Sequence, residues 1–262
     1  MHPSTLAPPS QAAAQQRYFV WVCRFGLLLV LATCASPLQS VAQQAPDPSA
    51  FCASAPARPS VDVQGLATVY CTSSPVMRTT LRAAHATSYP VFYAGLPIAW
   101  AGTWLARDNG GFSDAYRLTV TQFATYGVVM ALKRTVRRPR PYMTLPLQSR
   151  SERYRRGITD GSRASMPSGH AALSVALATS WSLSHPEWYV IAPSALWAST
   201  VTTSRLYLGV HYPSDVVAGT LLGAGIATAV HLLRETLTPA GLHPEGAASS
   251  PQRPMLNLRM RF

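Results

Sequence analysis

Charged side chains are scarce in this chain of 262 residues: Asp, Glu, Lys and Arg make up only 12% of it. A typical soluble domain carries about 25%, whereas here 48% of the residues are apolar. This shortage of charge argues against an ordinary solvent-exposed domain and favours burial in lipid or in a large helical core. The mean hydropathy of +0.09 is modest, so a soluble helical core stays open as the alternative to a membrane protein.

Strand-like alternation of polar and apolar residues is also absent before the C-terminal tail, and we therefore predict an all-α fold. Long uncharged stretches take its place, and we expect about five apolar helices in a bundle. The first stretch is long enough to span a bilayer. Gly219 and Gly223, four residues apart on the last one, predict a close helix–helix approach. The five stretches are residues 83–106, 118–132, 170–185, 188–203 and 216–233.

Composition divides the chain into four regions. The second is rich in Pro, Ser and Ala and is expected to be irregular, and the third holds the uncharged stretches. The last ends in alternating apolar residues that resemble a barrel strand, but one strand cannot close a barrel, so we interpret it as a tail. The regions are a signal peptide or N-terminal anchor (1–42), an irregular lead-in (43–80), a helical bundle domain (81–236) and a C-terminal tail (237–262).

The N-terminal region is typical of a targeting segment. Arg17 and Arg24 precede an apolar run, and the small residues Ser40 and Ala42 follow it at the spacing that a signal peptidase accepts. We expect export to the cell envelope, with the segment either cleaved or retained as an anchor. A lipoprotein signal ending at Cys34 is a further alternative.

Cysteine is rare, with four residues in the chain. Cys23 and Cys34 lie in the targeting segment, which leaves Cys52 and Cys71. An even pair in an exported chain favours one disulfide. Two unpaired thiols are the alternative.

Positive charge is concentrated in one stretch. Of the formal net charge of +12, ten basic residues against two acidic ones between Lys133 and Arg163 supply a net +8. A basic loop can bind nucleic acid. No aromatic-rich RNA-binding pattern or zinc pattern accompanies it, so we predict no nucleic-acid partner. A site for phosphate explains the stretch better.

The first of three candidate motifs opens this basic stretch. Lys133 is the only lysine in a chain with twenty-one arginines, which suggests a site that needs a compact point charge. Arg140 lies between two prolines that restrict the backbone and favour a rigid, bidentate phosphate contact. A basic cluster that binds lipid head groups is the alternative.

The second motif, Pro167-Ser168-Gly169-His170, opens an uncharged helical stretch. Ser168 is a suitable N-cap, and the N–H groups of Ser168, Gly169 and His170 at such a terminus bind anions. Gly169 permits a close approach of the backbone to a ligand, and His170 would lie beside that ligand. A capped helix with a surface histidine is the alternative.

The third motif joins Arg205, His211 and Asp215. A carboxylate four residues from a histidine can hold one imidazole nitrogen and leave the other as a nucleophile. A structural hydrogen bond would explain this pair alone. Together the three motifs supply positive clamps, an acid, a nucleophile and an orienting carboxylate for phosphoryl transfer. No cluster has metal-ligand spacing, so we expect neither metal nor cofactor.

The order and spacing of the motifs resemble a known family, the type 2 phosphatidic acid phosphatase superfamily, which also contains bacterial acid phosphatases and vanadium haloperoxidases. The residues that carry the resemblance are Lys133-x6-Arg140-Pro141, Pro167-Ser168-Gly169-His170 and Ser204-Arg205-x5-His211-x3-Asp215. It implies a helical-bundle hydrolase of phosphoric esters.

The resemblance also implies a role for each motif residue. His211 would attack phosphorus and form a phosphohistidine, Asp215 would orient His211, and His170 would protonate the leaving alkoxide and then activate water. The remaining residues would hold the phosphate oxygens, and they are Lys133, Arg140, Ser168, Gly169 and Arg205.

Function and location follow as expectations. Alternation of the five stretches across a membrane puts loops 133–166 and 204–215 on one face, and the export signal makes it the outer, periplasmic one. This places an Arg-rich loop against the positive-inside bias. We predict a metal-independent phosphatase acting on a phosphorylated membrane lipid or a small phosphate ester. The alternatives are a soluble periplasmic acid phosphatase, a vanadate-dependent haloperoxidase, which Asp215 disfavours, and a non-catalytic phosphate-binding envelope protein.

Overall fold

The computed structural model describes residues 49–53, 60–106, 109–155 and 163–242. Within these ranges the fold is all-α, with a single isolated bridge between Pro139 and Ala164 as its only β pairing, and the predicted fold class is confirmed. The predicted targeting segment over 1–42 and all of the predicted tail beyond residue 242 lie outside the described residues.

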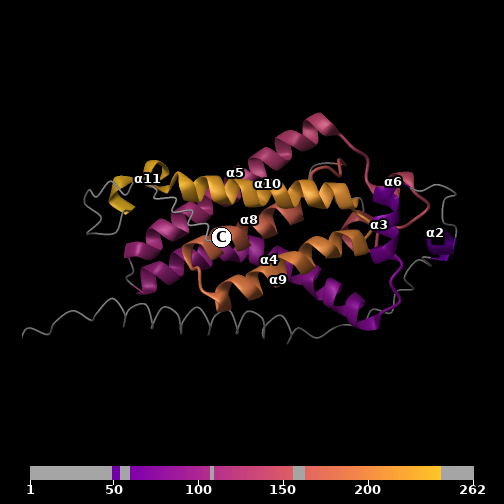
Figure 1. Ribbon diagram of the computed structural model, residues 1–262, viewed down its shortest axis with the longest axis horizontal. Coiled ribbons are helices and arrows are strands. Elements are labelled where there is room, and N and C mark those ends of the chain that lie inside the picture. The colour runs from indigo at the N-terminus through magenta and orange to yellow at the C-terminus, as the bar shows by residue number, and fades with distance from the viewer. Residues whose placement is uncertain (1–48, 54–59, 107–108, 156–162, 243–262) are drawn as a thin grey trace, which may run out of the picture.

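In the described ranges, five long helices form a bundle in which each runs opposite to the one before it in the chain (Figure 1). Each includes all or nearly all of one of the uncharged stretches, and four of the five helices are longer than their stretch. For example, the helix around 118–132 also takes in Asp114 and Arg117, which pair with each other one turn apart. A charged residue ends an uncharged stretch of sequence, but the helix itself can continue beyond that residue. The five are α4 Pro75–Ala106, α5 Asn109–Val136, α8 Gly169–Ser184, α9 Trp188–Tyr207 and α10 Pro213–Leu232.

The centre of the bundle is α8, which packs most extensively against α10 and also against α9 and α5. Ala171, Ala172 and Ala176 on α8 are fully buried. A Cβ added at Gly219 would collide with the Ser168 carbonyl oxygen, and one at Gly223 with that of Ala172. The two glycines therefore let α10 approach the α8 backbone closely, as their spacing predicts.

Successive long helices run in opposite directions, and this brings together the helix ends that carry the motifs. α5 and α9 both end, and α8 and α10 both begin, at the end of the bundle where α3 and α6 lie (Figure 1). The connections here include the short helices α6 Pro141–Thr144 and α7 Glu152–Arg155. Loops 133–166 and 204–215 thus share one end of the molecule. The chain continues beyond α10 through α11 Arg234–Leu237 and a 3-10 turn, Ala240–Leu242.

The prediction of an irregular lead-in over 43–80 is wrong for its described part. This part forms α2 Ser49–Ala53, α3 Val61–Tyr70 and the start of α4. The Ser60 side chain caps α3 by accepting a hydrogen bond from the Val63 N–H at 3.4 Å. The Pro- and Ser-rich composition hides a helix whose stability comes from tertiary packing, which propensity alone does not reveal.

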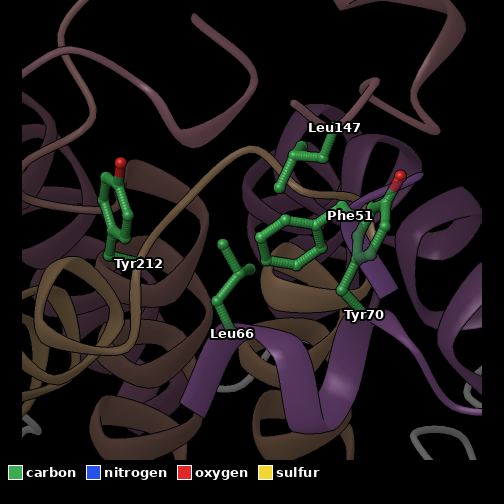
Figure 2. Packing of buried hydrophobic residues seen from close by; sticks show 5 residues of the cluster. All are labelled: Phe51, Leu66, Tyr70, Leu147 and Tyr212. Carbon is green, nitrogen blue, oxygen red and sulfur yellow. The ribbon is translucent and has the colours of Figure 1, made fainter. Parts of the chain in front are cut away.

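A small apolar cluster holds α3 on the end of the bundle (Figure 2). Leu66 and Tyr70 of α3 are fully buried within it, and a disulfide joins Cys52 to Cys71 with a Cα–Cα distance of 5.7 Å. Cross-links that close loops of this size stabilise a fold by about 3 kcal/mol. The cluster thereby ties the N-terminal helices to the loop that carries the third motif. Its buried members are Phe51, Leu66, Tyr70, Leu147 and Tyr212.

Candidate active site

The third motif lies on a sharp turn between α9 and α10. Gly209 adopts a positive φ of 69°, and a Cβ there would come within 2.9 Å of the Leu147 side chain. Only glycine meets both conditions at low cost. The turn directs His211 into the interior, where its side chain is almost fully buried.

The His211 ring lies between a carboxylate and a guanidinium. Its Nδ1 faces Asp215 Oδ2 at 3.7 Å, slightly beyond hydrogen-bond distance, and its Nε2 is 3.1 Å from Arg140 Nη1. Asp215 is fully buried in the first turn of α10, and its Oδ2 accepts a hydrogen bond from the Tyr212 N–H at 2.8 Å. The carboxylate thus has a defined place behind the imidazole, and Nε2 faces the positive side of the site.

The protonation state of His211 follows from its surroundings. Burial lowers the pKa of His211 well below its usual value, and the charges of Arg140 and Lys133 lower it further. The imidazole is therefore neutral at neutral pH and keeps a lone pair, which a nucleophile requires.

Lys133 and Arg140 of the first motif converge on the same point. Both are buried, at 5% and 1% exposure. Lys133 Nζ donates to the Ala164 carbonyl at 2.7 Å, and Arg140 Nη1 donates to the Val210 carbonyl at 3.2 Å. These carbonyls hold both cations in place inside the protein, and two buried cations beside one pocket suit a site for a phosphate anion.

The second motif begins α8 as expected, with one difference. Ser168 is the N-cap and accepts a hydrogen bond from the Ala171 N–H at 3.4 Å. The Ser168 N–H itself donates to the Asp215 carbonyl at 2.9 Å. This N–H is therefore not available to a phosphate, contrary to the expectation from sequence, because the close α8–α10 packing uses it.

His170 of the same motif is buried in an aromatic setting. Its ring centroid lies 5.0 Å from that of Tyr89 and 5.6 Å from that of Phe92, both on α4. Within the part of the chain that the structure describes, His170 Nε2 has no hydrogen-bond partner. An unpartnered buried nitrogen at a cavity wall is suited to exchange a proton with a bound group.

Arg205 completes the set of predicted residues, and it introduces a residue that the sequence analysis missed. Its Nε and Nη2 donate to Ser204 Oγ at 3.1 and 2.7 Å, and Nη2 is 2.8 Å from Nδ1 of His85 on α4. Because a guanidinium can only donate, Nδ1 of His85 accepts this hydrogen bond. The feature of the sequence that could have pointed to His85 is its position as a histidine inside the otherwise uncharged stretch 83–106.

Two more residues join the site without a motif to mark them. Arg138 Nη1 donates to Asp215 Oδ1 at 2.9 Å, and Arg138 Nη2 donates to Asp62 Oδ2 at 2.7 Å. Arg138 belongs to the basic stretch, but nothing in the sequence pairs it with an acid in the lead-in.

A cavity of about 440 Å³ connects these groups. Five predicted site residues line one end of it: Lys133, Arg140, Gly169, His170 and His211. The rest of the wall comes mainly from apolar and aromatic side chains of α4 and α5, among them Phe92, Leu96, Phe123, Tyr126 and Met130. The site is thus a positive, histidine-lined pocket with an apolar extension, a size and character typical of small-molecule sites.

No metal centre accompanies the pocket in the described ranges, where no three His, Cys, Asp or Glu residues gather closely enough to hold an ion.

A family model described as the PAP2 superfamily matches residues 114–239, which contain all three motifs. The chain belongs to the PAP2 superfamily. The resemblance inferred from the motifs is thereby confirmed. Asp62 and His85 lie outside the matched segment of this PAP2 chain.

Two curated relatives share local similarity with the PAP2 region. An undecaprenyl-diphosphatase of Sulfolobus acidocaldarius is 44% identical over 63 residues, or 24% of this chain and 30% of that protein. A lipid A 4'-phosphatase of Bacteroides thetaiotaomicron is 48% identical over 58 residues, or 22% of this chain and 25% of that protein. The matches thus span less than a third of either relative. Both names denote phosphatases, in agreement with the expected class of phosphoric ester hydrolase.

Among solved structures, the crystal structure of Aquifex aeolicus LpxE resembles this PAP2 chain with a TM-score of 0.53 and 21% sequence identity. The similarity covers 65% of this chain and 94% of that one. At this identity it supports the shared fold and not a shared substrate.

Proposed function

We propose that this chain is a phosphatase of the cell-envelope membrane that hydrolyses a lipid phosphomonoester or diphosphate through a phosphohistidine on His211. One observation carries the proposal: His211 lies between Asp215 and Arg140 in a cavity whose other walls are mainly apolar and aromatic. Lys133, Arg140, Ser168, Gly169 and Arg205 are proposed to hold the phosphate.

The geometry supports a two-step reaction. In the first step His211 Nε2 attacks phosphorus, the bond from phosphorus to the leaving oxygen breaks, and His170 gives that oxygen a proton. In the second step His170 takes a proton from water, whose oxygen attacks phosphorus and releases phosphate from His211. The negative charge of Asp215 stabilises the imidazolium formed between the steps. Arg and Lys supply the charge stabilisation for which many phosphatases use metal ions.

The apolar extension of the cavity favours a lipid over a small soluble ester. Tyr93 of α4 and Phe123 of α5 line the cavity and are also 73% and 66% exposed on the outer surface of the bundle. The wall of the cavity thus continues onto the surface between the two helices. A lipid can place its phosphate at His211 while its hydrocarbon chain leaves the site sideways between α4 and α5.

The outer surface of the bundle supports a membrane location. Uncharged stretches of α5, α9 and α10 expose large apolar side chains, such as Phe123, Leu196 and Leu221, where a soluble bundle would present charge. By length and composition α10 alone, among the helices in the described ranges, is able to cross a membrane. A single helix of this kind also occurs in soluble cores, so the exposed apolar surface carries more of the argument.

The orientation follows from the targeting segment. If residues 1–42 direct export, the end of the bundle that holds the site faces the periplasm or the outside. The phosphate-binding role of the basic residues then explains why positive charge lies on that face.

Carbonate extraction of membranes tests the location. We expect the protein to stay in the membrane pellet at high pH, because helices in contact with lipid are not displaced by loss of charge interactions. A protein released into the supernatant would contradict the membrane location and favour the soluble periplasmic acid phosphatase.

Phosphate release in EDTA tests the reaction. The purified protein is assayed in detergent on undecaprenyl diphosphate, lipid A, phosphatidic acid and soluble p-nitrophenyl phosphate. We expect activity without divalent metal, preference for a lipid over the soluble ester, and inhibition by vanadate, which binds where phosphate binds. Activity lost in EDTA and restored by Mg²⁺ would contradict the metal-free mechanism, and equal efficiency on the soluble ester would contradict a lipid substrate.

A further inference from the structure

The guanidinium of Arg138 bridges the candidate active site and α3. Arg138, in the connection between α5 and α6, donates from Nη1 to Asp215 Oδ1 at 2.9 Å and from Nη2 to Asp62 Oδ2 at 2.7 Å. Asp215 lies behind His211, whereas Asp62 comes from the first turn of α3, outside the segment that the family model matches. The two carboxylates thus bind opposite arms of one arginine.

Asp62 also holds the beginning of α10. Its Oδ1 accepts a hydrogen bond from the Ser214 N–H at 2.9 Å, and its Oδ2 accepts one from Ser214 Oγ at 2.7 Å. Burial acts to raise the pKa of Asp62, but the hydrogen bonds from Ser214 and Arg138 outweigh it and lower the pKa below its usual value. Asp62 is therefore ionised at neutral pH and forms a charged pair with Arg138.

The charges of these groups matter for His211. When His211 carries a phosphoryl group its imidazole is positive, and the nearby charge of Asp215 stabilises it. Arg138 alone would offset the charge of Asp215. Asp62 balances Arg138, so the three groups together keep a net charge of about −1 behind His211, by the usual charges of these side chains.

The position of Asp62 is set firmly enough for this role. The fully buried Leu66 and Tyr70 fix α3 against the bundle, and the disulfide closes the segment around it. Gly65 faces Pro213 so closely that a Cβ there would lie 2.9 Å from the proline ring. Packing therefore presses α3 onto the start of α10, next to Asp215.

We propose that Asp62 is a positioning residue for phosphoryl transfer, which acts through Arg138 to hold Asp215 in place and to preserve its negative charge toward His211. The inference rests on the proposed function. It assigns to α3 a part in the reaction that the three motifs do not include.

Asp62→Asn tests the inference, because asparagine keeps the shape and an oxygen for the Ser214 N–H but removes the charge and the oxygen that accepts from Arg138 Nη2. We expect kcat to fall about tenfold, as for other coupled neighbours, with KM changed less than about twofold and the thermal midpoint nearly unchanged. Glu235→Gln is the matched control, since its carboxylate is exposed on α11 at the other end of the bundle, and it is expected to leave kcat unchanged.

A double variant tests the route through Arg138. If Asp62 acts through Arg138, then Asp62→Asn combined with Arg138→Gln is no slower than the slower of the two single variants. An Asp62→Asn variant with kcat within about twofold of wild type would overturn the inference, and so would two losses that multiply in the double variant. Wild-type turnover measured in parallel separates the cases: an inactive wild type overturns the proposed function as well, whereas an active one leaves it standing.

Discussion

Replacing His211 with alanine is expected to lower kcat by at least about three orders of magnitude, as loss of a nucleophile does in other covalent catalysts. The reason is geometric. His211 has its Nε2 on the cationic side of the pocket, and Asp215 stands behind its Nδ1. His170 lacks a carboxylate behind its ring among the contacts described for it, so it does not replace His211 as the nucleophile.

The measurement combines initial rates of phosphate release with a thermal melt, which reports whether the variant is folded. Rapid quenching with a labelled substrate adds a direct readout, because wild type should carry acid-labile phosphate and His211→Ala should carry none. His231→Ala, a histidine change in the last turn of α10 far from the pocket, is the matched control. A folded His211→Ala variant that keeps more than about a tenth of the wild-type rate would refute the assignment.

Replacing His170 with alanine is expected to lower turnover of alkyl phosphates by about 10²–10⁴-fold, the range for loss of a general acid. The size of the loss should depend on the leaving group. An alkoxide needs a proton as it leaves, whereas nitrophenolate is stable without one, so phosphorylation by p-nitrophenyl phosphate should be affected less. The second step still needs His170 as the base, and phosphorylated His211 should therefore accumulate in this variant.

Pre-steady-state kinetics with p-nitrophenyl phosphate checks this directly, since the variant should release a burst of nitrophenol and then turn over slowly. His185→Ala is the control, because His185 caps the opposite end of the same helix. Equal losses on alkyl and aryl substrates, with no burst and no trapped phosphoenzyme, would show that His170 does not transfer the proton.

Several features of the fold could be predicted from sequence because they depend on local pattern. Long uncharged stretches with no alternation identify the five helices of the bundle, and Gly219 and Gly223 identify the tightest contact between two of them. The lead-in could not be predicted in this way. Residues 61–70 have few strong helix formers, and α3 persists because Leu66 and Tyr70 are buried against other parts of the chain.

The candidate active site also has one part that local sequence predicts and one part that it does not. Each motif is short, so the residues that lie next to His170 and His211 within a motif could be identified as site residues from their spacing alone. Contacts between the motifs and residues outside them could not be predicted, since these contacts join positions far apart in the chain. His85 reaches Arg205 over 120 residues and Asp62 reaches Arg138 over 76.

The sequence by itself determined the residue types of a phosphoryl-transfer site, their order and the all-α class, because motif spacing and long uncharged stretches without strand alternation are local properties of a chain. Only the tertiary structure decided which groups meet. It directed the Ser168 N–H to the Asp215 carbonyl and set Arg138 between Asp62 and Asp215. These outcomes depend on how closely α10 and α3 pack at one end of the bundle, and packing distance arises from all the side chains between two helices and not from any one motif.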